Sequence, residues 1–523
     1  MSFLTFFQQL GKKGSSKKEG PQSLAMASGK EVVRKKKSTS TRSRELLYFD
    51  LFYQLSYMSA ISSSGIPRNS IFEFSAQLPG RAAVFFKEID LITKHLGYDY
   101  SEACRIEGES VDDELVRNML LRLSGSLSSG EAESDFLGRE ADVFGMKYAD
   151  EYERKLDNLK QWTDAYSALT ISAVLIVIVG LVSTMIWSTD IVFILSLVGL
   201  TMGITIVGSW LILLMSPKEL VPLPEPSSRE QKLMRVLLFI FLPAAVVMAL
   251  LITSSGAGLG WALVLPAMII FPIGYVAVSD DRKVAGRDRD IGAFMRSLGG
   301  VSAAIGSTVT EGINRLDLRS SPALREETTK LRTRLGMGIL PSLCWRRFVL
   351  DNGSLVVNRC VGMFRDAMAL GADAESAGNR ASAYSERLHL LRAKRKLVSR
   401  PFGGLTFVMH AAIVLLLVFV TQVMGTFGTM IAGIEQDIPG AASSSAVGGY
   451  FSFNFEGLQL MSAMIVPVIL VLTVVNALTP KVADGGHKCK FLYNLSITMT
   501  ITGICMIIVP YMTDIVFGSV AAK

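Results

Sequence analysis

Residues 116–130 read VRNMLLRLSGSLSSG, and residues 357–371 read VNRCVGMFRDAMALG. In both stretches apolar residues recur in steps of four, three and four, and a glycine follows three positions later, as in Val116, Leu120, Leu123, Leu127 and Gly130 and in Val357, Val361, Phe364, Met368 and Gly371. Because this spacing places side chains on one face of an α-helix, each stretch is predicted to be an amphipathic helix. The two lie about 241 residues apart, and each precedes a set of strongly apolar segments. A helical module that occurs twice ahead of membrane helices is typical of a scaffold rather than of an enzyme with one pocket.

The chain is hydrophobic enough to require membrane helices. It has 523 residues, of which 50% are hydrophobic. Its mean hydropathy of +0.39 is too high for a soluble protein of this length. A helix needs roughly 20 apolar residues to cross about 30 Å of hydrocarbon. Seven segments satisfy this condition: Ala165–Trp187, Ile191–Met215, Leu233–Thr253, Leu259–Ser279, Gly404–Met424, Leu458–Leu478 and Phe491–Phe517.

Basic residues orient these seven predicted spans. The connections 188–190 and 254–258 and the segment 425–457 contain no lysine or arginine. The alternate connections do contain them, at Lys218, Arg229, Lys232, Lys481, Lys488 and Lys490, and residues 1–164 and 280–403 are rich in them. Because basic loops stay in the cytoplasm, we expect the N-terminus and both large soluble regions inside and the C-terminus outside the plasma membrane.

The topology predicts an all-α polytopic membrane protein with two cytoplasmic helical-bundle modules. We expect a disordered basic tail at 1–45, a first module at 46–164, four spans at 165–279, a second module at 280–403, and three spans at 404–523 with an external loop at 425–457. A shallow re-entrant segment is the alternative for this loop. The tail is too polar to bury a core. Its basic residues either attract anionic lipid headgroups or only obey the positive-inside rule.

Apolar stripes and breaker residues place helices within the two modules. The predicted helices are Glu45–Ile61, Asn69–Leu78, Ala82–His95, Val111–Ser126 and Glu131–Trp162 in the first module, and Ser354–Leu370 and Ala374–Val398 in the second, after a stripe at Phe294, Leu298, Val301 and Ile305.

The sequence lacks the motifs of common enzyme and metal sites. It has no G-x-x-x-x-G-K-[ST] phosphate loop and no G-x-S-x-G elbow. The glycine-rich stretch 256–260 lies between two predicted spans, outside the strand–turn–helix context of a dinucleotide site. His487 and Cys489 are too few for a metal site, and five widely spaced cysteines are typical of reduced thiols. We therefore expect no enzymatic activity, no cofactor and no metal.

The predicted spans carry few polar side chains in their interior, namely His410, Asn476 and Asn494. Ion-coupled transporters usually keep ionisable groups at this depth. We interpret His410 as a residue that forms hydrogen bonds between helices, with a proton relay as the alternative. Prolines that interrupt several spans are the only feature in favour of a transporter.

Charged residues on the predicted helices are candidates for a docking surface. An acidic run at 131–153 precedes the first span, and a basic run at 380–400 precedes the fifth. Such runs are either solvated faces or surfaces for a partner of complementary charge. The docking candidates are Arg122, Glu131, Glu133, Arg139, Arg365, Arg380, Arg387, Lys394, Arg395 and Lys396.

Three further stretches carry a resemblance to a known family. Residues 64–74 read SGIPRNSIFEF, residues 128–133 read SSGEAE, and residues 161–166 read QWTDAY. Together with the duplicated module ahead of membrane helices, they resemble the archaellum platform proteins of the type II secretion F-domain and type IV pilus platform family. The similarity extends from about residue 45 to the C-terminus. The platforms of archaeal adhesion pili share much of the same pattern.

The resemblance implies a membrane platform that contacts a hexameric secretion ATPase through its cytoplasmic modules. Such a platform passes the motion of the ATPase to filament subunits, and in an archaellum the same ATPase also supports rotation. We further expect a homodimer, contacts with lipids and other motor proteins, and no binding of nucleic acid. The alternatives are the platform of an adhesion pilus or secretion-like system and, less favoured, a membrane transporter. If the docking candidates are right, charge reversal at Lys394, Arg395 and Lys396 weakens ATPase binding.

Overall fold

The computed structural model describes residues 41–186, 191–219, 228–256, 258–306, 308–437 and 455–521. The regular elements in these ranges are α-helices and two short 3-10 helices, which confirms the predicted fold class. The predicted tail lies outside the described residues except for 41–45, which already belong to the first described helix, α2 (Thr41–Ser62).

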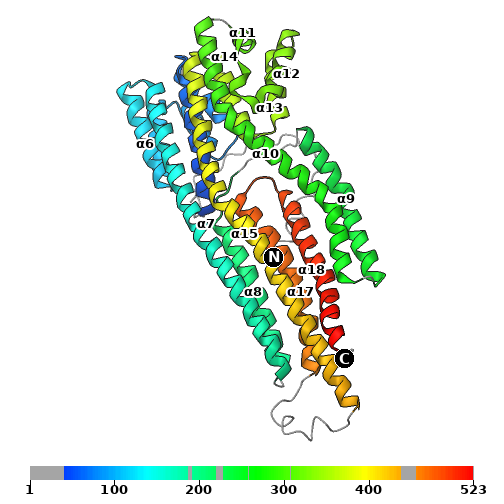
Figure 1. The fold of residues 1–523 in the computed structure, drawn as a ribbon. Helices are drawn as coiled ribbons and strands as arrows, with labels where there is room; N and C mark the ends of the chain where they lie inside the picture. Colours follow the sequence, from blue (N-terminus) through cyan, green and yellow to red (C-terminus); the bar gives the residue numbers. More distant parts are fainter. Residues whose placement is uncertain are drawn as a thin grey trace, which may run out of the picture. The chain divides into compact units, whose positions relative to one another are not determined.

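Two sets of six helices repeat one plan along the chain (Figure 1). The first set is α2, α3 (Arg68–Ala76), α4 (Ala83–Leu96), α5 (Tyr100–Ser110), α6 (Glu114–Ser129) and α7 (Glu133–Ile186). The second set is α10 (Leu259–Ile305), α11 (Val309–Arg315), α12 (Arg325–Gly336), α13 (Pro341–Asn352), α14 (Leu355–Ala369) and α15 (Ala374–Asp437), with 3-10 turns at Leu318–Ser320 and Pro322–Leu324. Helices α3, α5, α6 and α7 begin 241 residues before α11, α13, α14 and α15, so the duplication extends well beyond the two stretches that revealed it.

The caps of the two repeated amphipathic helices also correspond. Asp113 accepts hydrogen bonds from the first backbone N–H groups of α6, and Ser354, 241 residues later, does the same for α14. Beyond the two helices, Gly130 and Gly371 have φ values of 74° and 85°, which glycine adopts without steric cost. Equivalent polar caps and equivalent glycines therefore fix the length of the helix in both repeats.

Seven of the described helices are long and apolar enough to cross a membrane, as the sequence predicts. They are α7, α8 (Ile191–Met215), α9 (Arg229–Ser254), α10, α15, α17 (Phe455–Asp484) and α18 (Lys490–Ala521). The predicted boundaries at 164/165, 279/280 and 403/404 each lie inside one continuous helix, α7, α10 or α15. Helices α15 and α17 also extend into both ends of the predicted loop at 425–457, of which 438–454 lie outside the described residues.

Helices α5, α11, α12 and α13 are not among the helices that the sequence pattern predicts. In α5, the residues that face the core include Cys104 and Glu107 as well as Tyr100 and Ala103, so no apolar stripe reveals the buried face. The other predicted helices agree with the structure to within a few residues at most ends.

The two modules share one core instead of forming two separate bundles. A continuous cluster of buried apolar side chains includes Leu51 of α2, Phe144 of α7, Phe294 of α10 and Phe364 of α14. Helix α2 contacts its own α7 and also α14 and α15 of the second repeat. The first repeat is thus packed directly against the second, although more than 300 residues separate the contacting segments in sequence.

Close helix contacts in the membrane rely on glycine. A Cβ atom on Gly274 of α10 would lie 2.4 Å from the backbone of Tyr493 in α18. On the same pair of helices, a Cβ atom on Gly503 would lie 2.7 Å from the carbonyl oxygen of Gly260. Small residues let membrane helices approach each other in this way.

Candidate functional site

A buried arginine joins the two repeats. Arg359 of α14 donates to a carboxylate oxygen of Asp50 in α2 at 2.5 Å and to the hydroxyl of Tyr384 in α15 at 3.0 Å. Its guanidinium carbon lies 4.3 Å from the ring centre of Phe49 and 4.6 Å from that of Tyr53. A planar cation with several donors suits such a site, because it can stack on rings and pair with a carboxylate together.

A second contact lies on the same two helices. The hydroxyl of Tyr57 in α2 donates to Asp366 in α14 at 3.1 Å. Burial, followed by the nearby charge of Asp366, raises the pKa of Tyr57 above its usual value, so the hydroxyl remains a donor. Together, the Arg359 and Tyr57 contacts fix α2 against α14 at two points.

The long helices α7 and α15 lie against each other through arginines that sit over glycines (Figure 1). Arg380 of α15 passes over Gly138 of α7, where a Cβ atom would lie 2.6 Å from the guanidinium. Arg387 passes over Gly145 at the same 2.6 Å and donates to the carbonyl of Asp142 at 3.1 Å. Seven residues separate the two glycines and the two arginines alike, so one face of each helix carries both contacts.

Near the membrane end of the modules, α15 is attached to the connections between spans. Arg392 forms ion pairs with Asp288 of α10 and with Glu219, which follows α8. The distance from Arg392 to the Glu219 carboxylate is 2.8 Å. Arg395, only 6% exposed, donates to the carbonyls of Pro217 at 2.9 Å and Ala483 at 2.9 Å. Two arginines one turn apart therefore tie a helix of the second module to α10, to the segment that follows α8 and to the last turn of α17.

The charges at this junction are buried, and their pKa values reflect it. Burial raises the pKa of Glu219, but the positive charges of Arg392 and Arg395 outweigh it and hold that pKa below its usual value. For Asp288 burial prevails over the attraction of Arg392, and its pKa is raised. Arg392 compensates both carboxylates, and Arg395 also contributes at Glu219.

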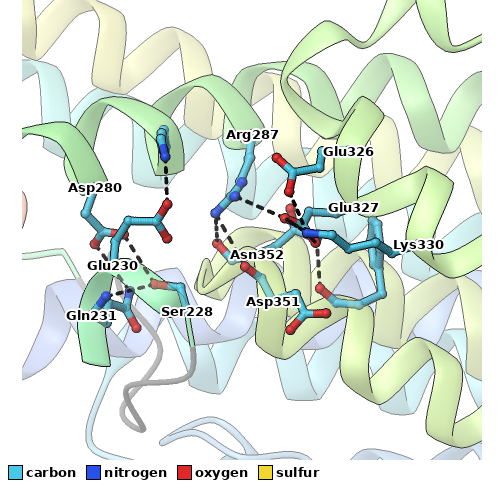
Figure 2. A network of polar contacts seen from close by, with 12 residues as sticks. Ser228, Glu230, Gln231, Asp280, Arg287, Glu326, Glu327, Lys330, Asp351 and Asn352 are labelled. Atoms are coloured by element: carbon cyan, nitrogen blue, oxygen red, sulfur yellow. Dashed lines mark hydrogen bonds and ion pairs between the residues drawn. The ribbon is translucent and has the colours of Figure 1, made fainter. Parts of the chain in front are cut away.

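A further polar network lies where α9, α10, α12 and α13 meet (Figure 2). Arg287 of α10 donates to the carbonyl of Asn352 at 2.9 Å and pairs with Glu327 of α12 at 3.5 Å. Asp280 accepts from Ser228 and Gln231 at the start of α9, each at 3.4 Å. Both groups of contacts are made by α10, which therefore holds the start of α9 through Asp280, and α12 and the end of α13 through Arg287.

Within the membrane helices, polar side chains form a chain of hydrogen bonds. Tyr166 of α7 donates to Asn476 of α17 at 2.7 Å, and the Asn476 amide is 3.1 Å from His410 of α15. The other ring nitrogen of His410 is 3.0 Å from Thr502 of α18. His410 thus forms hydrogen bonds between helices, as interpreted from the sequence.

Replacing Tyr166 by phenylalanine is expected to remove its hydrogen bond to Asn476 and to lower the free energy of unfolding by about 0.6–1 kcal/mol. The loss stays this small because the aromatic ring still packs. Thermal unfolding in detergent measures the change. Tyr275→Phe is the control, since Tyr275 is 59% exposed on α10 and should have no effect. Equal transition temperatures for the Tyr166 variant and the wild type would contradict the expectation.

Most docking candidates are paired within the chain. The structure pairs Arg122 with Glu140, Arg139 with Glu131, Arg68 with Glu133, Arg365 with Asp366, Arg380 with Asp142, and Lys394 with Glu153. The acidic run of the first module and the basic run of the second therefore face each other in part. Their role in docking stays a prediction, and charge reversal at Arg395 does not test it, because that side chain is buried. Lys396 is half-buried on the same helix.

The sequence reasoning missed Asp50, Arg359 and Arg392 as residues that join the parts of the chain. The available signal was a charged residue on a mostly apolar helix face, since Arg359 lies three residues after Val356 and four before Met363, and both of these are buried. Among the described residues no group of three or more His, Cys, Asp or Glu side chains is placed to hold a metal ion.

Two curated proteins are similar to this chain over most of its length. Flagella accessory protein J of Methanocaldococcus jannaschii is 21% identical over 457 residues, which cover 84% of this chain and 79% of that protein. Flagella accessory protein J of Methanococcus voltae is 23% identical over 459 residues, which cover 83% and 79%. No protein-family model matches the chain, and no solved structure matches it. The chain is thus similar to these two proteins along the duplicated modules and the membrane helices, and this similarity confirms the resemblance noted in the sequence.

Proposed function

We propose that this protein is the membrane platform of an archaellum-type filament machine and couples a cytoplasmic hexameric ATPase to filament assembly and rotation. It acts without catalysis of its own, as a homodimer, and its other partners are filament subunits, motor proteins and lipids. Both modules and the N-terminus face the cytoplasm, and the C-terminus faces outside. The relatives named above support the archaellum over an adhesion pilus or a secretion system.

One observation carries the mechanical part of this proposal. In each repeat the last helix of the module continues without a break into a membrane span, as α7 over Glu133–Ile186 and as α15 over Ala374–Asp437. An α-helix transmits displacement along its axis because its backbone hydrogen bonds are internal. Helix α15 continues past Pro401, which removes one of these bonds near the predicted start of the span. The Arg359 and Arg392 contacts hold the two modules and the spans together, so a push on one module moves the others.

Deletion of the gene in its host tests the proposal. We expect the loss of both swimming and the swimming filament, seen by tracking cells and by negative-stain electron microscopy, and recovery with a plasmid copy. A plasmid copy that carries the exposed substitution Met146→Ser serves as a matched control and should restore both. Retained swimming with loss of a thinner pilus would assign the protein to adhesion instead. Unchanged filaments of every kind would refute the platform function.

A further inference from the structure

The turn between α12 and α13 exposes an unusual amount of apolar surface. Residues 336–343 are eight consecutive exposed positions. Among them Met337 is 72% exposed, Ile339 42%, Leu340 61% and Leu343 54%. Gly338 has a φ of 75° and Pro341 starts α13, so the backbone holds this turn in a defined shape. A cluster of exposed apolar side chains outside the spans marks an interaction site.

The surroundings of this turn carry positive charge. Between Thr328 and Leu350 the chain has five basic residues, Lys330, Arg332, Arg334, Arg346 and Arg347, and no acidic residue. Lys330 pairs with Glu326 and Glu327, and Arg334 pairs with Asp351, all just outside this stretch. Arg346 and Arg347 are both exposed beside the turn, and Arg347 reaches Asp351 at 3.2 Å. The surface formed by residues 336–343 with Arg346 and Arg347 is called the basic turn below. Its chemistry suits a partner with apolar side chains and carboxylates.

The position of α13 along α10 keeps the basic turn away from the bilayer. The last residue of α13, Asn352, is bonded to Arg287 of α10, and Phe348 stacks on Phe294 at 6.0 Å. Towards its first residue, α13 therefore moves away from the predicted fourth span, which ends at Ser279. At 1.5 Å per residue, Phe294 is already about 22 Å along the helix from that end, and the headgroup layer is only about 5–8 Å thick. A protein, rather than the membrane that this chain spans, is the occupant that reaches the turn.

The first repeat has the same exposed turn with different charges. Leu96 and Tyr98, 241 residues before Met337 and Ile339, are 67% and 46% exposed at the turn between α4 and α5. There Asp99 and Glu102 stand at the start of α5, where the second repeat has none. The duplication thus preserves an exposed apolar turn and gives only the second one a basic rim.

We propose that the basic turn is the docking site for an acidic segment of the motor ATPase that carries apolar side chains. This inference rests on the proposed function and specifies where the ATPase binds. The apolar side chains of the turn bury against those of the segment, and its carboxylates pair with Arg346 and Arg347 at the rim. Because the pairing is at the surface, binding weakens as the salt concentration rises.

The test uses the full-length protein in nanodiscs of neutral lipid and the purified ATPase of the same host. Biolayer interferometry measures the Kd for the wild type, for Ile339→Ser/Leu340→Ser and for Arg346→Glu. We expect both variants to bind at least tenfold more weakly. Met146→Ser on α7, where the side chain is 50% exposed, is the matched control and should bind as the wild type does. All four substituted side chains are exposed, and equal thermal unfolding of the variants verifies that the fold is intact.

The outcomes separate this inference from the function on which it rests. If the wild type does not bind the ATPase, the proposed coupling fails and the docking site with it. If the wild type binds and both variants bind equally well, the site is elsewhere and the platform function stands. A fluorescent amino acid at position 339 tests the other possible occupant of the turn, which is lipid. A blue shift on changing from neutral to anionic nanodiscs without ATPase would assign the turn to lipid and overturn the inference, whereas a shift on addition of ATPase alone supports it.

Discussion

Replacement of Arg359 by alanine is expected to lower the free energy of unfolding by about 3–5 kcal/mol. The substitution leaves the carboxylate of Asp50, which is 13% exposed, without its cation. It also removes the group on which Phe49 and Tyr53 stack and the donor to Tyr384. Because these residues come from α2, α14 and α15, the loss falls on the contact between the two repeats. Thermal unfolding in detergent, followed by tryptophan fluorescence, measures the change.

Two comparisons test whether this loss comes from the buried charge. The double variant Asp50→Asn/Arg359→Met should regain part of the stability, because it removes both charges and keeps the volume filled. Arg296→Ala breaks a surface pair with Glu386 in which both side chains are more than half exposed, and should cost less than about 1 kcal/mol. Similar losses for Arg359→Ala and Arg296→Ala would show that Arg359 does not join the repeats.

Replacement of Arg392 by alanine is the second variant with a large expected effect, also about 3–5 kcal/mol at pH 8. It leaves Glu219 and Asp288, which are 6% and 4% exposed, without their shared cation. The expected loss depends on pH in a direction that follows from the pKa values. Without Arg392, burial raises the pKa of Asp288 further above its unfolded value, and Glu219 loses one of the two cations that hold its pKa down.

Since the folded variant then binds more protons than the unfolded chain, its stability falls as the pH rises through the unfolded and towards the folded pKa. The difference from the wild type should therefore shrink as the pH is lowered from 8 to 5. Unfolding temperatures measured across this range verify the sign. A difference that is constant with pH, or that grows towards acid, would mean that Glu219 and Asp288 do not depend on Arg392. Arg296→Ala again serves as the control. Because Arg296 and its partner Glu386 are both exposed, its effect on stability should depend little on pH.

The relation between sequence and structure differs between local and long-range features. The repeated helices at 116–130 and 357–371 and the seven spans could be predicted, because hydrophobic periodicity and length are properties of neighbouring residues. The role of His410 could also be inferred, because a lone polar residue in an apolar helix needs a partner. Helix α5 could not, since its buried face includes Glu107 and Cys104, which no apolar stripe reveals.

The candidate site shows the same division. The sequence has an acidic run ahead of the first span and a basic run ahead of the fifth, which by themselves are interpreted either as solvated faces or as docking surfaces for a partner. In the structure Glu153 pairs with Lys394, and Arg380 with Asp142, so the runs meet within the chain. Charge alone cannot distinguish a contact between repeats from a contact between proteins, because both use the same complementarity.

By itself, the sequence determined that this protein is a duplicated helical module joined to membrane helices, since propensity, capping and hydropathy act over one or two helical turns. Only the tertiary structure decided that the two modules share one core, that Arg359 and Arg392 are buried bridges, and that the turn at 336–343 is left uncovered. Burial of a charge depends on what the rest of the chain brings to it from hundreds of residues away. No local pattern encodes that arrangement, because it is a property of how the helices pack.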